Sequence, residues 1–149
     1  MGILNNGVNV AEYVYDFDVD GGTFGTGIAL SAKNNKSAVP IGAVVCGVTA
    51  KVITAPTSEG SATVGWGDGS TADGYSGTTI AIATLVDNYV VNGWDRDASL
   101  LWDGNNDHPI YYTVTSAATG AFNILIGTAD LTAGKIVFFV SYFEAAVDC

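Results

Sequence analysis

The chain has 149 residues, a length typical of one domain that buries roughly 70% of its unfolded surface. Fifteen acidic residues against five basic ones leave a net charge of −10, and so acidic a surface repels phosphate backbones, which argues against a nucleic-acid partner. Charged residues make up only 13% of the chain, about half the usual fraction, so we expect copies of the chain or another protein to cover part of its apolar surface.

Residues 1–9 are polar, rich in Asn and without hydrophobic periodicity, which predicts a flexible N-terminal arm before a folded domain at residues 10–149. An extended arm can add a strand to the sheet edge of a partner. The candidate partner-binding residues are the spaced apolar side chains Ile3, Leu4, Val8 and Val10. The arm has neither the basic region nor the apolar core of a secretory signal, and no apolar stretch of the chain is long enough to span a bilayer. We therefore expect synthesis in a reducing cytoplasm and no membrane partner.

From Glu12 the chain alternates between apolar and polar residues, which predicts a half-buried strand as far as Asp20. Its apolar face carries Tyr13, Tyr15, Phe17 and Val19. Its polar face carries Asp16, Asp18 and Asp20, which with the following Gly21 match the first half of a calcium-binding loop. Such a loop ends in Glu at its twelfth position, where this chain has Gly27. Two hypotheses remain: a Ca²⁺ ion bound by the three carboxylates, or an acidic outer strand face with no cofactor.

The rest of the chain consists of short alternating or β-branched runs separated by turns of Gly, Pro, Asn and Ser. These runs predict strands at residues 26–32, 44–54, 61–67, 78–86, 110–115, 122–127 and 135–143, with an Asn-Gly hairpin signal at 92–93. No segment of ten or more residues has a helical period. The pattern predicts an all-β fold, a single-domain antiparallel β-sandwich with jelly-roll-like connections.

The last predicted strand is apolar on both of its faces. One face carries Phe138, Val140 and Tyr142, and the other carries Val137, Phe139 and Phe143. A strand that is apolar on both sides is covered on both sides, here by a second sheet with a loop or by a neighbouring subunit. Val137, Phe139 and Phe143 are therefore candidate contacts of a homo-oligomer.

Residues that could support catalysis are few and scattered. His108 is the single histidine, and no serine lies in a G-x-S-x-G sequence, so no nucleophile–base pair is evident. The acid pairs Asp95/Asp97 and Asp103/Asp107 could hydrolyse sugars, but they lie in Gly- and Asn-rich segments typical of solvated turns. We therefore predict no enzymatic activity.

Three tryptophans leave a second class of function open. Trp66, Trp94 and Trp102 could form a platform on which sugars stack, as in a carbohydrate-binding module or an adhesin-like fibre or tail component. Large aromatic residues near strand ends also serve as anchors in a core or an interface. The two alternatives differ in whether the rings are exposed.

Three stretches of the chain resemble small virion proteins of tailed bacteriophages. They are residues 15–22 (YDFDVDGG) followed by Gly25, residues 53–64 (ITAPTSEGSATV), and residues 129–135 (ADLTAGK) before an aromatic strand. Such proteins decorate or cement the capsid and are β-sandwiches or jelly rolls. The resemblance implies a non-enzymatic protein on the capsid exterior, made in the host cytoplasm, whose partners are the major capsid protein and further copies of itself. A trimer would suit the local threefold positions of a capsid. The resemblance transfers no catalytic residue, and it does not extend to residues 94–107.

Overall fold

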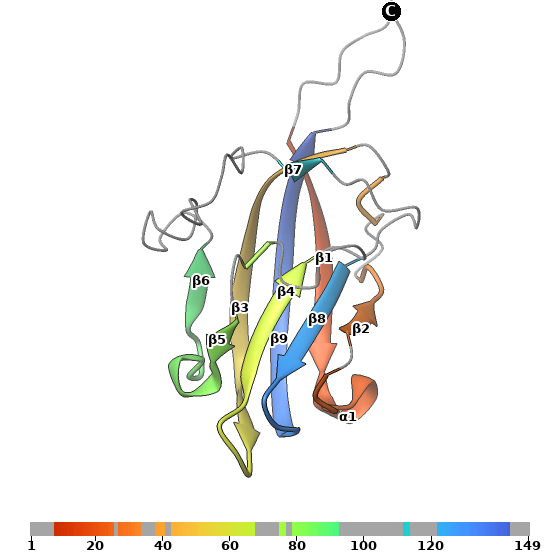
Figure 1. The fold of residues 1–149 in the computed structure, drawn as a ribbon. Coiled ribbons are helices and arrows are strands. Elements are labelled where there is room, and N and C mark those ends of the chain that lie inside the picture. Colours follow the sequence, from red (N-terminus) through yellow and green to blue (C-terminus); the bar gives the residue numbers. More distant parts are fainter. Residues whose placement is uncertain are drawn as a thin grey trace, which may run out of the picture.

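Two antiparallel sheets pack face to face as a β-sandwich (Figure 1). This computed structural model describes residues 8–25, 27–33, 38–40, 43–67, 75–76, 79–92, 112–113 and 122–143. Within these residues the helical elements are one turn each, α1 (Phe17–Asp20) and the 3-10 helix η1 (Ile82–Thr84). The predicted all-β sandwich is confirmed.

The strand order follows a jelly-roll-like path. One sheet has the order β1-β9-β3-β6, with β7 also paired to β3; its strands are β1 (Asn9–Asp16), β3 (Val44–Ser58), β6 (Val90–Asn92), β7 (Tyr112–Thr113) and β9 (Leu131–Phe143). The other has the order β2-β8-β4-β5, with strands β2 (Gly27–Leu30), β4 (Thr63–Gly67), β5 (Ile80–Ala81) and β8 (Phe122–Gly127). The first strand lies beside the last, and the chain changes sheet from β1 to β2, to β3 and to β4. Each sheet therefore pairs strands that are distant in sequence, as in two interlocked Greek keys.

The two longest strands extend beyond their predicted limits. β3 continues to Ser58 and β9 begins at Leu131, because these two ends pair with each other. The register shifts between Thr54 and Thr57, and Pro56 lies in this irregular stretch. A proline has no N–H to donate to a ladder and is tolerated at such a bulge. The predicted turn at 55–60 was therefore placed several residues too early.

The strand predicted from Glu12 to Asp20 ends at Asp16, so the last part of that prediction is wrong. Asp16 is the N-cap of α1, and its side chain accepts a hydrogen bond from the Asp18 backbone N–H. Val19, which was placed on the buried face, has an exposed fraction of 76%. An aspartate that caps the following turn competes with the strand for the same backbone groups, and here the turn prevails.

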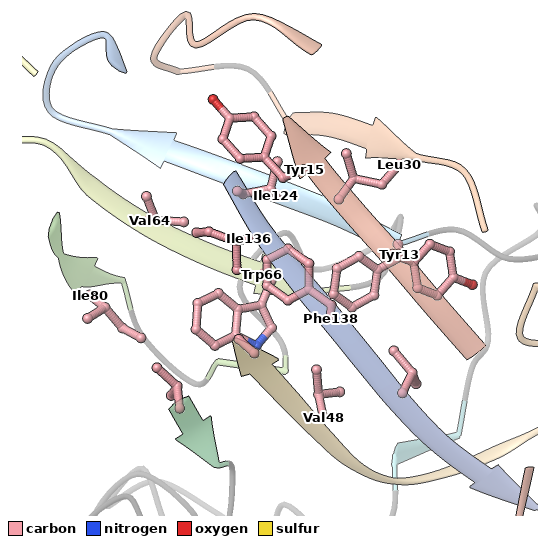
Figure 2. Packing of buried hydrophobic residues seen from close by; sticks show 14 of the residues in the cluster. Tyr13, Tyr15, Leu30, Val48, Val64, Trp66, Ile80, Ile124, Ile136 and Phe138 are labelled. Carbon is pink, nitrogen blue, oxygen red and sulfur yellow. The ribbon is translucent and has the colours of Figure 1, made fainter. Parts of the chain in front are cut away.

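The core lies between the two sheets and is rich in aromatic rings (Figure 2). The ring of Tyr13 stacks on Phe122 at a centroid distance of 4.7 Å, and Phe138 packs against Phe122 at 4.9 Å and against Trp66 at 5.3 Å. These four residues come from both sheets and have exposed fractions of 0 to 1%. The sandwich is thus held by side chains that period-two alternation directs inward.

Candidate functional site

The outer face of the β1-β9-β3-β6 sheet is the surface on which the predicted oligomer contacts lie. From residue 134 to the end of β9 the residues alternate between buried and half-buried, and Val137, Phe139 and Phe143 are all half-buried on the side away from the core. The opposite side of the same strand, from Ile136 to Tyr142, is 0 to 4% exposed. The facing sheet therefore covers one face of this strand. The cover that the apolar pattern also predicted for the other face stays a prediction.

The neighbours of Val137 and Phe139 follow from the strand register. Val137 lies between Val14 of β1 and Lys51 of β3. Phe139 lies between Glu12 and Thr49 in the same two strands. Because β9 is a central strand, flanking side chains shield part of each residue and leave the remainder to solvent. The centre of this face is therefore apolar, and Glu12, Thr49 and Lys51 lie beside it on the two flanking strands.

Two outer-face residues were missed by the sequence analysis. Val14 is half-buried next to Val137, and Val90 of the edge strand β6 is 46% exposed beside Lys51. The alternation that starts at Glu12 contains the signal for Val14, because Glu12, Val14 and Asp16 are spaced two apart. For Val90 the sequence had no such signal, because its strand covers only three residues.

The candidate partner-binding residues of the arm fall into two groups. Ile3 and Leu4 lie outside the described residues. Val8 and Val10 are exposed to 55% and 37%. Val10 belongs to β1 and pairs with Ser141, and β1 begins at Asn9, one residue before the predicted start of the folded domain. Val10 thus lies on the outer sheet face rather than on an arm.

The three aspartates of the predicted calcium loop belong to a single helical turn: Asp16 is the N-cap of α1, and Asp18 and Asp20 lie within it. The Asp16 carboxylate accepts a hydrogen bond of 2.8 Å from Lys135 Nζ, and the Asp20 carboxylate accepts one of 2.9 Å from the Asp16 backbone N–H. The hydrogen bond from Lys135 holds the pKa of the Asp16 carboxyl below its usual range. Two of the three carboxylates therefore already have partners within the chain.

No group of three or more His, Cys, Asp or Glu side chains in the described part of the chain is placed to hold a metal ion. Calcium binding at Asp16, Asp18 and Asp20 remains a prediction. Among the same residues no helix combines the length and apolarity needed to cross a bilayer.

Trp66 is part of the core and cannot form a sugar platform. Its side chain is 1% exposed and packs against Phe138 between the sheets (Figure 2). Trp94 and Trp102, the other members of the hypothetical platform, lie outside the described residues. So do His108 and the acid pairs Asp95/Asp97 and Asp103/Asp107.

Comparison with protein-family models and with curated proteins gives no match. Among solved structures, the chain is similar to a chain of the cyanophage Pam1 capsid asymmetric unit, with a TM-score of 0.59 and 22% identity, over 97% of this chain and 89% of that one. The two share one fold. The chain also matches the acid-stable capsid structure of Helicobacter pylori bacteriophage KHP30, at a TM-score of 0.45 and 19% identity, over 93% of this chain and 89% of that one. The likeness to the Pam1 chain confirms the fold implied by the resemblance to phage virion proteins.

Proposed function

We propose that this chain is a non-enzymatic structural protein of a phage virion that binds the outer surface of the capsid. The observation that carries the proposal is the fold likeness to a chain of the Pam1 capsid, which extends over nearly the whole of both chains. The matched chain is therefore of similar length. The virion-like stretches at residues 15–22, 53–64 and 129–135 support the same function independently.

The charge of the chain favours the exterior of the shell. A net charge of −10 would be repelled by packaged DNA inside a capsid, whereas on the outside it keeps a repetitive surface soluble. We therefore place the protein on the capsid exterior, bound to the major capsid protein.

The outer face of the β1-β9-β3-β6 sheet is our candidate for contact between copies. Val14, Val137 and Phe139 are adjacent, apolar and half-buried, and a second copy would remove their remaining surface from water. Lys51 and Glu12 flank this centre and would form the polar rim that interfaces commonly have. With local threefold positions as the binding sites, the oligomer is a trimer.

The arm contributes a contact with the capsid. Ile3, Leu4 and Val8 precede β1, and Val8 is more than half exposed. Ordering such a segment costs about 1 to 2 kcal/mol per residue, so each arm alone binds weakly. An oligomer presents several arms at high effective concentration, which offsets that cost.

The experiment mixes the purified protein with DNA-free shells of the major capsid protein and measures co-sedimentation. Wild-type protein is expected to sediment with the shells, and protein that lacks residues 2–8 is expected to bind more weakly. Wild-type protein that stays in the supernatant at micromolar concentration would refute the proposed function. Full binding by the truncated protein would remove the arm from the proposal.

Light scattering tests the contact between copies. The V137D/F139D variant places two charges in the apolar centre and is expected to give the monomer mass of 15.3 kDa, whereas the wild type gives a multiple of it. The matched control is L125D, since Leu125 is also half-buried on a central strand, but in the other sheet. A monomeric wild type, or a dissociated L125D, would contradict the assignment of this face.

A further inference from the structure

The end of the sandwich that carries α1 presents two large apolar side chains to solvent. Val19 in α1 is 76% exposed, and Phe24, in the turn that follows, is 52% exposed. Figure 1 shows α1 at the same end as the turns between β3 and β4 and between β8 and β9. We call residues 16–25, 59–62 and 128–130 together the α1 end. Single exposed apolar residues are common on proteins, so exposure alone does not mark a binding site.

The backbone that carries Val19 is fixed on both sides. The Tyr15 hydroxyl donates a 2.7 Å hydrogen bond to the Gly21 carbonyl, and the Gly21 N–H donates a 3.0 Å bond to the Phe17 carbonyl. Val19 therefore projects from a turn that is closed by its own caps. The backbone of such a turn loses little conformational freedom when a partner covers it.

The backbone of Phe24 is fixed by the β8–β9 turn. The Phe24 N–H donates a 2.9 Å hydrogen bond to the Asp130 carboxylate, and the Gly25 N–H donates one of 2.8 Å to the Ile126 carbonyl. Just before Phe24, the Gly22 carbonyl accepts a 2.8 Å bond from the Leu131 N–H. Residues more than a hundred positions away thus fix the backbone that carries the half-exposed Phe24 ring.

The α1 end is strongly acidic. It contains Asp16, Asp18, Asp20, Glu59 and Asp130. The adjoining base is Lys135, which pairs with Asp16 at 2.8 Å, so five acids and one base leave a local net charge of −4. Two copies of this end would repel each other, and a partner with positive charge would be attracted.

We infer that the α1 end docks on a shell protein, where Val19 and Phe24 enter an apolar depression rimmed by Lys and Arg side chains. This inference rests on the proposed function and adds the surface and the chemistry of the contact. An apolar centre with a polar rim is the usual arrangement of a protein–protein interface. The acids speed the encounter, and the two apolar side chains slow dissociation.

The α1 end and the arm lie at opposite ends of β1. The eight residues of this strand separate them by about 25 Å, at about 3.3 Å per residue. A subunit held at both positions would contact two places on the shell, which is the geometry by which a bound protein cements neighbouring shell subunits.

The test measures binding to DNA-free shells for the wild type and three variants. V19S/F24S removes the apolar contact, and D18K/E59K reverses two exposed charges; A29S is the matched control, since Ala29 is exposed on the outer face of the other sheet. Melting temperatures equal to that of the wild type show that each variant folds. We expect V19S/F24S to lower affinity at least about tenfold, D18K/E59K to lower it and flatten its salt dependence, and A29S to have no effect.

The outcomes separate the two proposals. If the wild type binds and both α1-end variants bind as tightly, the docking inference is wrong while the proposed function stands. If the wild type does not bind the shells, both are overturned. If A29S weakens binding as much as V19S/F24S, the contact lies elsewhere on the sandwich and the inference is likewise overturned.

Discussion

The hydroxyl of Tyr15, the last buried residue of β1, donates a 2.7 Å hydrogen bond to the carbonyl oxygen of Gly21, which ends α1. The Tyr15 ring is fully buried, so the bond ties the exposed turn directly to the core. Gly21 has a φ of +77°, which an L side chain adopts only with strain. The turn therefore depends on both residues.

Removing this hydroxyl should destabilise the protein without changing its fold. We expect Y15F to lower the free energy of unfolding by about 1 kcal/mol, the usual net value of one hydrogen bond. Urea denaturation followed by tryptophan fluorescence measures the change. Y89F is the control, because Tyr89 is 41% exposed, and equal losses in both variants would contradict the role given to Tyr15.

The buried tyrosines predict a loss of stability at alkaline pH. Burial raises the pKa of Tyr13 and of Tyr15 above their ordinary value of 10.0. The unfolded chain releases these protons near pH 10, and the folded chain releases them only at higher pH. The contribution of the two hydroxyls to the free energy of unfolding is therefore fully present below pH 10 and is lost as pH rises beyond it. Urea midpoints between about pH 9 and pH 11 should fall in the wild type and fall less in Y15F. An unchanged midpoint would contradict the burial of these hydroxyls.

Asp16 predicts that stability falls as pH is lowered into the acid range. The hydrogen bond from Lys135 lowers the pKa of Asp16, so its contribution is present above the ordinary value of 3.8 and is lost as pH falls through the lower folded value. D16N keeps a capping side chain but loses the charge, whereas D16A loses both. We expect the melting temperature to fall more in D16A than in D16N, and K135M to resemble D16N. Equal melting of D16A and wild type would show that neither the cap nor the ion pair contributes.

Calcium at the three aspartates can be tested with the same assay. If Asp16, Asp18 and Asp20 bind Ca²⁺, a chelator should lower the melting temperature and added Ca²⁺ should restore it. Because Asp16 and Asp20 already accept hydrogen bonds within the chain, we expect identical melts with and without chelator. A chelator-dependent shift that disappears in D18N would establish the site instead.

Truncation of a central ring should test the core. Phe138 contacts both Trp66 and Phe122 across the sandwich, and F138A is expected to cost about 3 to 5 kcal/mol. F24A is the control, since Phe24 is 52% exposed and should change stability little. Chemical denaturation of both variants provides the comparison. A large loss in F24A would show that this ring supports the fold and is not free for a partner.

The alternation of apolar residues in the sequence was sufficient to predict the fold class and much of the core. Tyr13, Tyr15, Phe138 and Val140 were each assigned to a shared strand face, and each is buried. Period two is a local property of extended backbone, so it can be recognised without knowledge of the partner strand. For the same reason Val137, Phe139 and Phe143 could be assigned to the opposite face of β9.

The tertiary structure decided the features that depend on residues distant in sequence. Asp16 to Asp20 continue an alternating pattern, yet Lys135, 119 positions away, and the cap at Asp16 support a helical turn there. The sequence alone allowed Trp66 to be exposed or buried. It is buried because the facing sheet places Phe138 against it. Long-range contacts of this kind leave no periodic signal in the chain, because they are set by how strands distant in sequence become neighbours in the sandwich.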